Sequence, residues 1–477
     1  MASPKTNKNN SEVIINVVPE LIVDDQPWIY KVPDHLRKLK EEAYTPKYIS
    51  IGPFHSNNPE LKKTGKKLKY FSEFSKRLNS HPLAMDKFKA YLKENEQTIK
   101  DSYFELDEHY KCEKDNDFFV DMILYDSVFI MELFLRNSER NSVKKDEPEK
   151  YKDDIMFTIS WICKAIRRDL LLLENQIPLF VLEKLYNSVL HLLRGDDDDD
   201  GDKKKFPETF IGLAFYYFEF FYRQKKDSDI THMTKNYKTR KHFTDLIRYT
   251  YLPEIIQNSS SVDPKSCFTS YRKIKQHHIP TRTAKKLNEA GISFVKVQGK
   301  SYLDIKFQKT PILSLFLCLG FLPFTKYLKV RLEFPQLHVN QTTECVLRNL
   351  IALEQCHYSD QPFVCNYVSL IDSLIHTGED VELLVDNEVI VHDLGSHKEL
   401  ARLVNSLCTN VEVSSNYYGK IIKKLNRHYD NGWMSNMGRL KSVYFRDPWR
   451  ISSTVVGVVV FLFAIFNFLK LIRVFNP

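Results

Sequence analysis

Three acidic residues stand among large apolar side chains, and they are the candidates for catalysis in this sequence. Asp126 and Glu132 lie within the apolar run Phe118 to Leu135, and Glu174 follows four consecutive leucines. A carboxyl group in an apolar environment has a raised pKa and can act as a general acid, as a hydrolase would need. The commoner role is that of a buried hydrogen-bond acceptor, which we favour while the catalytic interpretation stays open.

Helical geometry separates one of these acids from its neighbours. At about 100° per residue, Asp117, Asp121 and Glu132 fall within about 60° of one another around a helix. Asp126 lies on the opposite face of the same helix. The apolar run therefore predicts a buried helix that carries acids on two sides.

The polar triplet Glu174, Asn175 and Gln176 stands directly before an Ile-Pro step. Proline disfavours helical geometry at the preceding residue, so the triplet falls where a helix ends. Carbonyl groups at a helix end lack intrahelical partners, and Asn and Gln amides can donate to them. Asp169 is about 140° from Glu174 around a helix, so one helix does not present the two as a pair. We interpret the triplet as the polar core of a helix corner, where alanine substitutions lower stability and abundance.

Other motifs give no cofactor or metal site. Gln298 to Ser301 (QGKS) resembles the end of a phosphate-binding P-loop, but Phe294 stands where that motif needs glycine. Cys345, Cys356 and Cys365 have spacings that fit no usual zinc module. The eight cysteines include no CxxC pair, which is typical of reduced thiols in a cytosol-facing domain. We expect no cofactor and no metal.

The amino-acid composition limits the classes of protein to which this chain can belong. The chain has 477 residues, 43% of them hydrophobic and 13% aromatic, enough for one large core or two ordinary ones. The net charge of +8 arises from 69 basic and 61 acidic residues. This balance does not indicate nucleic-acid binding, although mild basicity suits a surface near anionic lipid. We expect no nucleic-acid partner.

The C-terminal stretch Ile451 to Leu469 contains no charge and is mostly apolar. Its length roughly matches the ~30 Å hydrocarbon thickness of a bilayer. Trp449 and Arg450 precede it and Lys470 follows it, as interfacial anchors do. We predict a transmembrane helix over residues 449–470, a short tail over 471–477, and the lipid bilayer as a partner.

Basic residues predict the orientation of this helix. Arg439, Lys441, Arg446 and Arg450 precede it, whereas Lys470 and Arg473 follow it. The positive-inside rule then places the large domain in the cytosol, in the manner of a tail-anchored protein of the plasma membrane or an endomembrane. The opposite orientation would expose the glycosylation sequons at Asn258 and Asn340.

The rest of the chain reads as one mainly helical domain over residues 25–446, after a flexible tail over 1–24. Polar and charged stretches predict mobile insertions near residues 136–154, 194–206 and 256–266. After residue 290 the alternating segments ISFVKVQ, SYLDIKFQ and KVRLEF predict strands, and VELLVDNEVIV predicts a hairpin that turns at Asp386-Asn387. The fold class is therefore mainly α (α+β), with a small antiparallel sheet in the C-terminal half and a C-terminal transmembrane helix.

Several blocks resemble one plant-specific family, the "domain of unknown function 247", also called uncharacterised protein family 0481. They include IYKVPDHLRKLKEEAYTPKYISIGPFH, FFVDMILYDSVFIMELF, DLLLLENQIPLFVLEKLY, EAGISFVKVQGKSYLDIKF, LRNLIALEQC and YFRDPWRISS, in order over about residues 25–470. Ser127 and Val128 stand where the family usually has Gly and Cys. The resemblance implies a plant protein with a C-terminal membrane helix and no established enzymatic activity. Some grass members are implicated in self-incompatibility, which suggests recognition.

These observations predict a membrane-anchored, non-enzymatic recognition or signalling module that acts through protein contacts with an unknown partner. One alternative is a hydrolase-like enzyme that uses Asp126, Glu132 or Glu174. Another is a scaffold tethered to an endomembrane.

Overall fold

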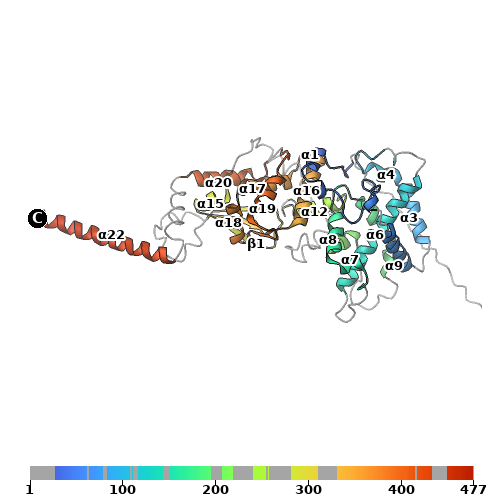
Figure 1. Cartoon of the computed structure of the whole chain (residues 1–477), viewed down its shortest axis with the longest axis horizontal. Coiled ribbons are helices and arrows are strands. Elements are labelled where there is room, and N and C mark those ends of the chain that lie inside the picture. The colour runs from blue at the N-terminus through green and yellow to red at the C-terminus, as the bar shows by residue number, and fades with distance from the viewer. Residues whose placement is uncertain are drawn as a thin grey trace, which may run out of the picture. The chain divides into compact units, whose positions relative to one another are not determined.

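The computed structural model describes residues 27–61, 64–78, 83–107, 110, 116–142, 151–194, 207–218, 240–253, 256, 281–309, 330–413, 416–431 and 448–475. The predicted tail over 1–24 and most of the predicted insertions lie outside these ranges. Within them the protein is mainly helical with two small sheets, as predicted (Figure 1). The chain divides into two compact units, each built from segments that are not consecutive in sequence.

Unit 1 comprises Met1–Lys31, Ser50–Thr158 and Ile177–Tyr217. Its central element is α6 (Asn116–Ser142), against which three helices pack: α2 (Thr64–Arg77), α3 (Leu83–Glu94) and α9 (Leu179–Arg194). The remaining described helices are η2 (Pro59–Leu61), α4 (Glu96–Asp101), α7 (Ile155–Thr158) and α10 (Phe210–Phe218). The apolar run of the sequence thus forms the core helix of this unit.

Helix α6 continues beyond the apolar run into residues predicted as a mobile insertion. Arg136 and Glu139 are buried in α6, and Asp154 is buried beyond it. Arg136 donates to Glu132 at 2.7 Å and to Asp154 at 2.8 Å, and Arg77 of α2 pairs with Glu139 at 2.8 Å. Residues 136–142 are part of α6, and these ion pairs join Arg136, Glu139 and Asp154 within the buried part of the unit, so the chain does not leave the fold at residue 136 as predicted. Residues 143–150 lie outside the described ranges.

Unit 2 comprises Val32–Ile49, Ile159–Gln176 and Phe218–Pro477. Its central helix is α16 (Gln341–Cys356), in which every residue from Glu344 to Glu354 is buried. Around it lie α8 (Ser160–Asp169), α12 (Phe243–Tyr251), α17 (Phe363–Leu374), α19 (His397–Leu407) and the short η1 (Glu41–Ala43). The unit also contains α1 (Asp34–Arg37), α15 (Ala284–Glu289), α18 (Gly378–Asp386) and α20 (Gly419–Asp430).

Two small sheets belong to unit 2. The first has the order β1-β3-β2, formed by β1 (Ile292–Val297), β3 (Val330–Pro335) and β2 (Lys306–Gln308). β2 runs antiparallel to β3, but β1 runs parallel to it. The second sheet pairs β4 (Leu337–Val339) with β5 (Ile390–His392) in parallel. β1 and β3 were predicted as strands, β2 is the last part of a predicted strand, and β4 was not predicted. The wholly antiparallel arrangement was wrong, because β3 lies between β1 and β2 and runs parallel to β1.

The predicted hairpin at Asp386-Asn387 is also wrong, since its first half forms α18. Asp380 accepts hydrogen bonds from the backbone N–H and the hydroxyl of Thr377, both at 3.1 Å, which starts a helix there. Val381 and Leu384 then face the core at helical spacing. Only the second half of the predicted hairpin is a strand, β5, and it pairs with β4.

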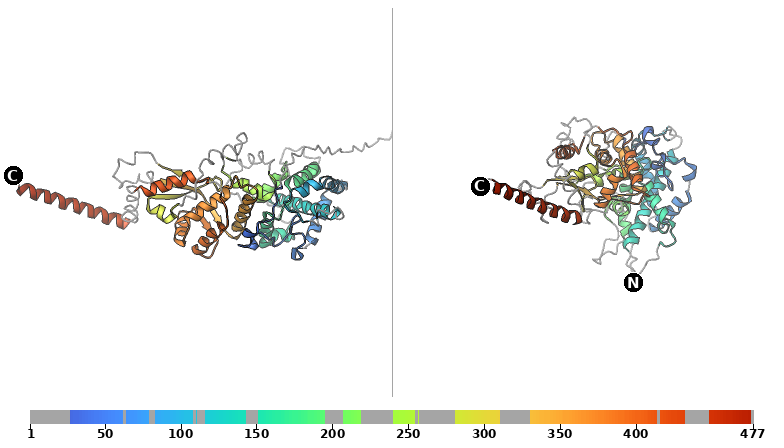
Figure 2. Two further views of the ribbon diagram at one scale, coloured as in Figure 1. Left: turned by 90° about the horizontal axis from the view of Figure 1, so that it is seen from above. Right: turned by 60° about the vertical axis from the view of Figure 1, so that its left-hand side comes forward.

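The C-terminal element is α22 (Pro448–Phe475), a continuous helix of 28 residues that contains the predicted segment 449–470 (Figure 2). Its stretch Ser452–Lys470 has a mean hydropathy of 2.2, and none of it is buried. By length and composition this helix is able to cross a membrane.

Arg77→Ala tests the ion-pair network that holds the end of α6. The change removes the ion pair of Arg77 with Glu139 and its ion pair with Glu132, which is 1% exposed and keeps Arg136. We expect the free energy of unfolding of the purified chain to fall by about 3 kcal/mol, because a buried carboxylate loses its cation. Urea denaturation measures this. The adjacent Lys76→Ala removes an exposed pair with Glu73 and should cost less than about 1 kcal/mol; equal losses would contradict the network.

Candidate functional site

Asp126, the first candidate acid, anchors backbone in unit 1. It is 1% exposed, and the Gly52 N–H donates to its Oδ2 at 2.9 Å. Lys67 of α2 forms an ion pair with Oδ1 and also donates to the Ser50 carbonyl at 2.6 Å. Burial raises the pKa of Asp126, against the lowering effect of Lys67 and the Gly52 amide. Gly52 has a φ of 71°, a conformation that glycine adopts without strain, so its amide can point at the carboxylate.

Glu132, the second candidate, is engaged by two guanidinium groups. Arg77 Nε donates to Oε2 at 2.6 Å and Arg136 Nε donates to Oε1 at 2.7 Å, so each carboxylate oxygen has a charged donor. Six residues separate Glu132 from Asp126 along α6, about 120° apart around the helix axis. The two acids therefore have separate partners on different faces. Two further acids of α6, Asp117 and Asp121, pair with lysines of α3 near the surface.

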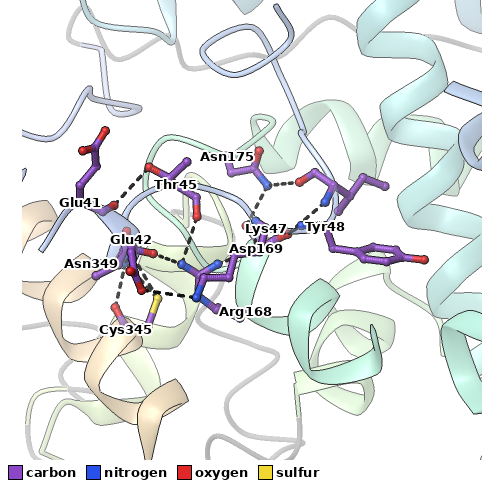
Figure 3. A network of polar contacts seen from close by, with 12 residues as sticks. Glu41, Glu42, Thr45, Lys47, Tyr48, Arg168, Asp169, Asn175, Cys345 and Asn349 are labelled. Carbon is purple, nitrogen blue, oxygen red and sulfur yellow. Dashed lines mark hydrogen bonds and ion pairs between the residues drawn. The ribbon is translucent and has the colours of Figure 1, made fainter. Parts of the chain in front are cut away.

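Asp169, at the end of α8, is a buried acid of unit 2 that is surrounded by donors (Figure 3). Its side chain is fully buried and accepts hydrogen bonds from three consecutive backbone N–H groups, those of Lys47, Tyr48 and Ile49, at 2.6–3.1 Å. Arg168 adds an ion pair at 2.8 Å. Burial raises the pKa of Asp169, while these donors oppose the rise. The sequence did not single out Asp169 as an anchor, and its only signal was an acid beside four leucines.

Glu174, the third candidate, also accepts a backbone amide. It is 4% exposed, the Val32 N–H donates to its Oε1 at 2.5 Å, and Arg37 of α1 forms an ion pair with the same oxygen. Each of the three candidate acids thus has a cation and a structural role. They do not share partners, and none of them lines the cavity described below.

Asn175 and Gln176 complete the corner after α8. The Asn175 amide donates to the carbonyls of Ile49 and Asp169 at 3.1 and 2.9 Å. The Gln176 amide donates to the carbonyls of Leu170 and Leu172 at 2.8 and 2.7 Å, and its oxygen accepts the Phe243 N–H at 2.9 Å. Both side chains are fully buried, and they lie in the connection after α8 rather than in its last turn.

Helix α16 joins the same network, which Figure 3 shows from close by. Asn349 accepts the Leu173 N–H at 2.9 Å and donates to the Ala43 carbonyl at 2.8 Å. Cys345 donates to that carbonyl as well, and burial raises the pKa of this thiol to about 11. Among the described residues no three His, Cys, Asp or Glu side chains meet as metal ligands would.

One cavity in the described part of unit 2 has a volume of about 520 Å³ and lies where β1 ends beside β4 and the start of α16. The rings of Tyr251 and Tyr302 form part of it, with centroids 4.7 Å apart. The charged or polar side chains that line it are Lys296, Gln298, Gln336, His338, Asn340, Thr343 and Asp393. Amides, a hydroxyl and aromatic faces can bind a polar ligand by hydrogen bonds and stacking. Gln298 and Gly299 belong to the P-loop-like stretch that was rejected as a motif from the sequence, and the cavity that they line was not predicted.

The predicted membrane anchor residues all belong to α22. Trp449 is 86% exposed and Leu469 is 57% exposed. Arg450, Ile451 and Lys470 occupy the two ends of the apolar stretch, as predicted from their order in the sequence.

Asn175→Ala tests the corner. The change leaves the buried carbonyls of Ile49 and Asp169 without the amide that donates to them, so the free energy of unfolding should fall by about 2–4 kcal/mol, and cellular abundance should fall with it. Asn387→Ala is the matched control, because Asn387 also donates to a carbonyl, that of Leu383 at 2.7 Å, but at an exposed position. Urea denaturation of both variants compares them. A well-expressed Asn175→Ala protein as stable as the control would exclude a structural role.

Comparison with known proteins shows relatives along nearly the whole chain. UPF0481 protein At3g47200 of Arabidopsis thaliana is 25% identical over 453 residues, which cover 91% of this chain and 84% of the relative. Putative UPF0481 protein At3g02645 of the same plant is 24% identical, with 91% and 88% covered. No solved structure matches the chain. The family DUF247, described as "Plant protein of unknown function", matches residues 29–463. The chain therefore belongs to this plant family, as the order of its sequence blocks indicated.

Proposed function

We propose that the protein is a single-pass membrane protein whose cytosolic units form a recognition module for another protein. The proposal of a membrane anchor rests on α22, because none of its apolar stretch Ser452–Lys470 is buried. Phe461, Phe463 and Phe466 are each more than 60% exposed. Leaving such side chains in water costs about 1.5–3 kcal/mol each, and a bilayer removes that cost.

The flanking residues support the orientation. Trp449 stands at the entrance of the helix, and basic residues are more numerous before the apolar stretch than after it. Amphipathic rings prefer the headgroup level, and Lys and Arg are retained on the cytosolic side. This charge asymmetry favours units 1 and 2 in the cytosol, at the plasma membrane or an endomembrane.

Two observations favour recognition over catalysis. The three candidate acids each form an ion pair and serve as structural acceptors. None of the three lines the cavity, so the hydrolase alternative lacks its candidate acids there. The cavity is lined instead by amides, a hydroxyl and two tyrosine rings, together with the side chains of Lys296, His338 and Asp393. Such groups provide specificity for the side chains of a partner.

Translation of the full chain with microsomes tests the anchor. We expect the protein to resist alkaline extraction and Val460→Asp/Phe463→Lys to be extracted, because charges at mid-bilayer cost about 2.5–3.5 kcal/mol each. Val460→Leu/Phe463→Leu is the control. A glycosylation acceptor tag placed after Pro477 should be modified if the units are cytosolic. Glycans at Asn258 or Asn340 would reverse the proposed orientation, and an extractable wild-type chain would exclude the anchor.

Proximity labelling in plant cells tests recognition through the cavity. Gln298→Ala/Asp393→Ala changes two exposed side chains that line it, so the fold and abundance should be unchanged. We expect the variant to lose a reproducible subset of labelled neighbours. Glu382→Ala/Asp386→Ala, also exposed but outside the cavity, should retain them. A wild-type protein without reproducible neighbours, or identical neighbours for all three chains, would contradict the proposal.

A further inference from the structure

Helix α20 of unit 2 has one strongly basic face. Lys420, Lys423, Lys424 and Arg427 are all exposed and recur every three or four residues, so they share one side of the helix. Asp430 is the only acidic residue within α20. The opposite side consists of Ile422, Leu425 and His428, which are buried.

The buried side fixes the direction of the basic face. Leu425 is fully buried, and the His428 ring lies 3.1 Å from the Ala290 carbonyl oxygen. Just before the helix, the Tyr418 hydroxyl donates to the Leu303 carbonyl at 2.7 Å. The four basic side chains therefore extend from a helix whose other side is packed against the unit. They are not exposed because the segment is loosely attached.

Three of the four basic residues of this face have no acidic partner among the described residues. Among the described residues, Lys423, Lys424 and Arg427 take part in no ion pair; Lys424 lies 5.9 Å from the centroid of the Phe307 ring. Lys309, after β2, adds an exposed charge on the side where β2 contacts α20. The nearby acids are engaged elsewhere, since Asp304 pairs with Lys306 at 3.5 Å and Asp430 with Arg282 at 3.9 Å.

The chain tethers α20 to the apolar helix. Residues 431–447 alone connect α20 to α22, and a segment of that length spans at most about 60 Å even when fully extended. The segment itself contains Arg439, Lys441 and Arg446. If α22 enters a bilayer, a basic surface is thereby kept at high effective concentration beside the headgroups.

We infer that the basic face of α20 docks on a bilayer surface rich in anionic phospholipid, of the phosphatidylserine class. The location beside the anchor rests on the proposed membrane insertion of α22, whereas the affinity of the face for anionic headgroups does not. Lys and Arg side chains near such a surface gain electrostatic attraction that falls off within a Debye length, about 8 Å at physiological salt. The contact orients unit 2 against the cytosolic leaflet.

Vesicle flotation tests the inference with the full chain. Val460→Asp/Phe463→Lys is used as the background, so that insertion of α22 does not mask peripheral binding. We expect this protein to float with vesicles of phosphatidylcholine plus phosphatidylserine, to bind pure phosphatidylcholine at least tenfold less, and to dissociate at high salt. Adding Lys423→Glu/Lys424→Glu/Arg427→Glu should lower binding to the anionic vesicles at least tenfold.

A second triple variant controls for net charge. Lys38→Glu/Lys87→Glu/Lys398→Glu reverses three exposed lysines on other elements and changes the charge by the same amount. It should bind like the background protein, and size-exclusion chromatography checks that all samples are folded and monodisperse.

Three outcomes would overturn the inference. The first is equal binding to both vesicle types, and the second is equal loss in both triple variants. The third is an α20 variant that retains vesicle binding but loses labelled protein neighbours, which would assign the face to an acidic protein. The microsome experiment separates the two proposals, because failure of α22 to insert leaves the flotation result unaffected.

Discussion

Backbone N–H groups of the segment between residues 29 and 55 donate hydrogen bonds to buried carboxylates, and the rest of the structure depends on this arrangement. In unit 1 Asp126 accepts the Gly52 amide; in unit 2 Asp169 accepts three amides and Glu174 accepts that of Val32. The segment contains only the short α1 and η1, so helices and strands satisfy few of its backbone groups. A buried N–H without a partner costs about 1–3 kcal/mol, and carboxylates remove that cost.

Asp126, Glu132 and Glu174 form ion pairs with Lys67, Arg77 and Arg37, respectively. Among the described residues, features open to contact with other molecules include the cavity beside β1, β4 and α16, the basic face of α20, and the apolar surface of α22. These three belong to unit 2.

Part of the fold followed from local pattern and part did not. Alternation of apolar and polar residues predicted β1 and β3, and helical spacing predicted α6 and α19. The pattern could not predict that β3 pairs with β1 in parallel, because the partner of a strand depends on distant residues. The pattern also gave the wrong element at Val381 and Leu384. As part of an apolar cluster these residues fit a strand, whereas counted from the helix start at Thr377 their spacing fits a helix.

The sequence alone determined that residues 452–470 form an apolar helix and that the Glu174–Gln176 triplet stands at a helix corner, since both depend on neighbouring residues. Only the tertiary structure decided which groups the acids engage. Asp169 meets Tyr48 across 121 residues of sequence, and Glu174 meets Val32 across 142. Such partners have no local signature, because a buried carboxylate accepts any amide that the fold brings within hydrogen-bond distance.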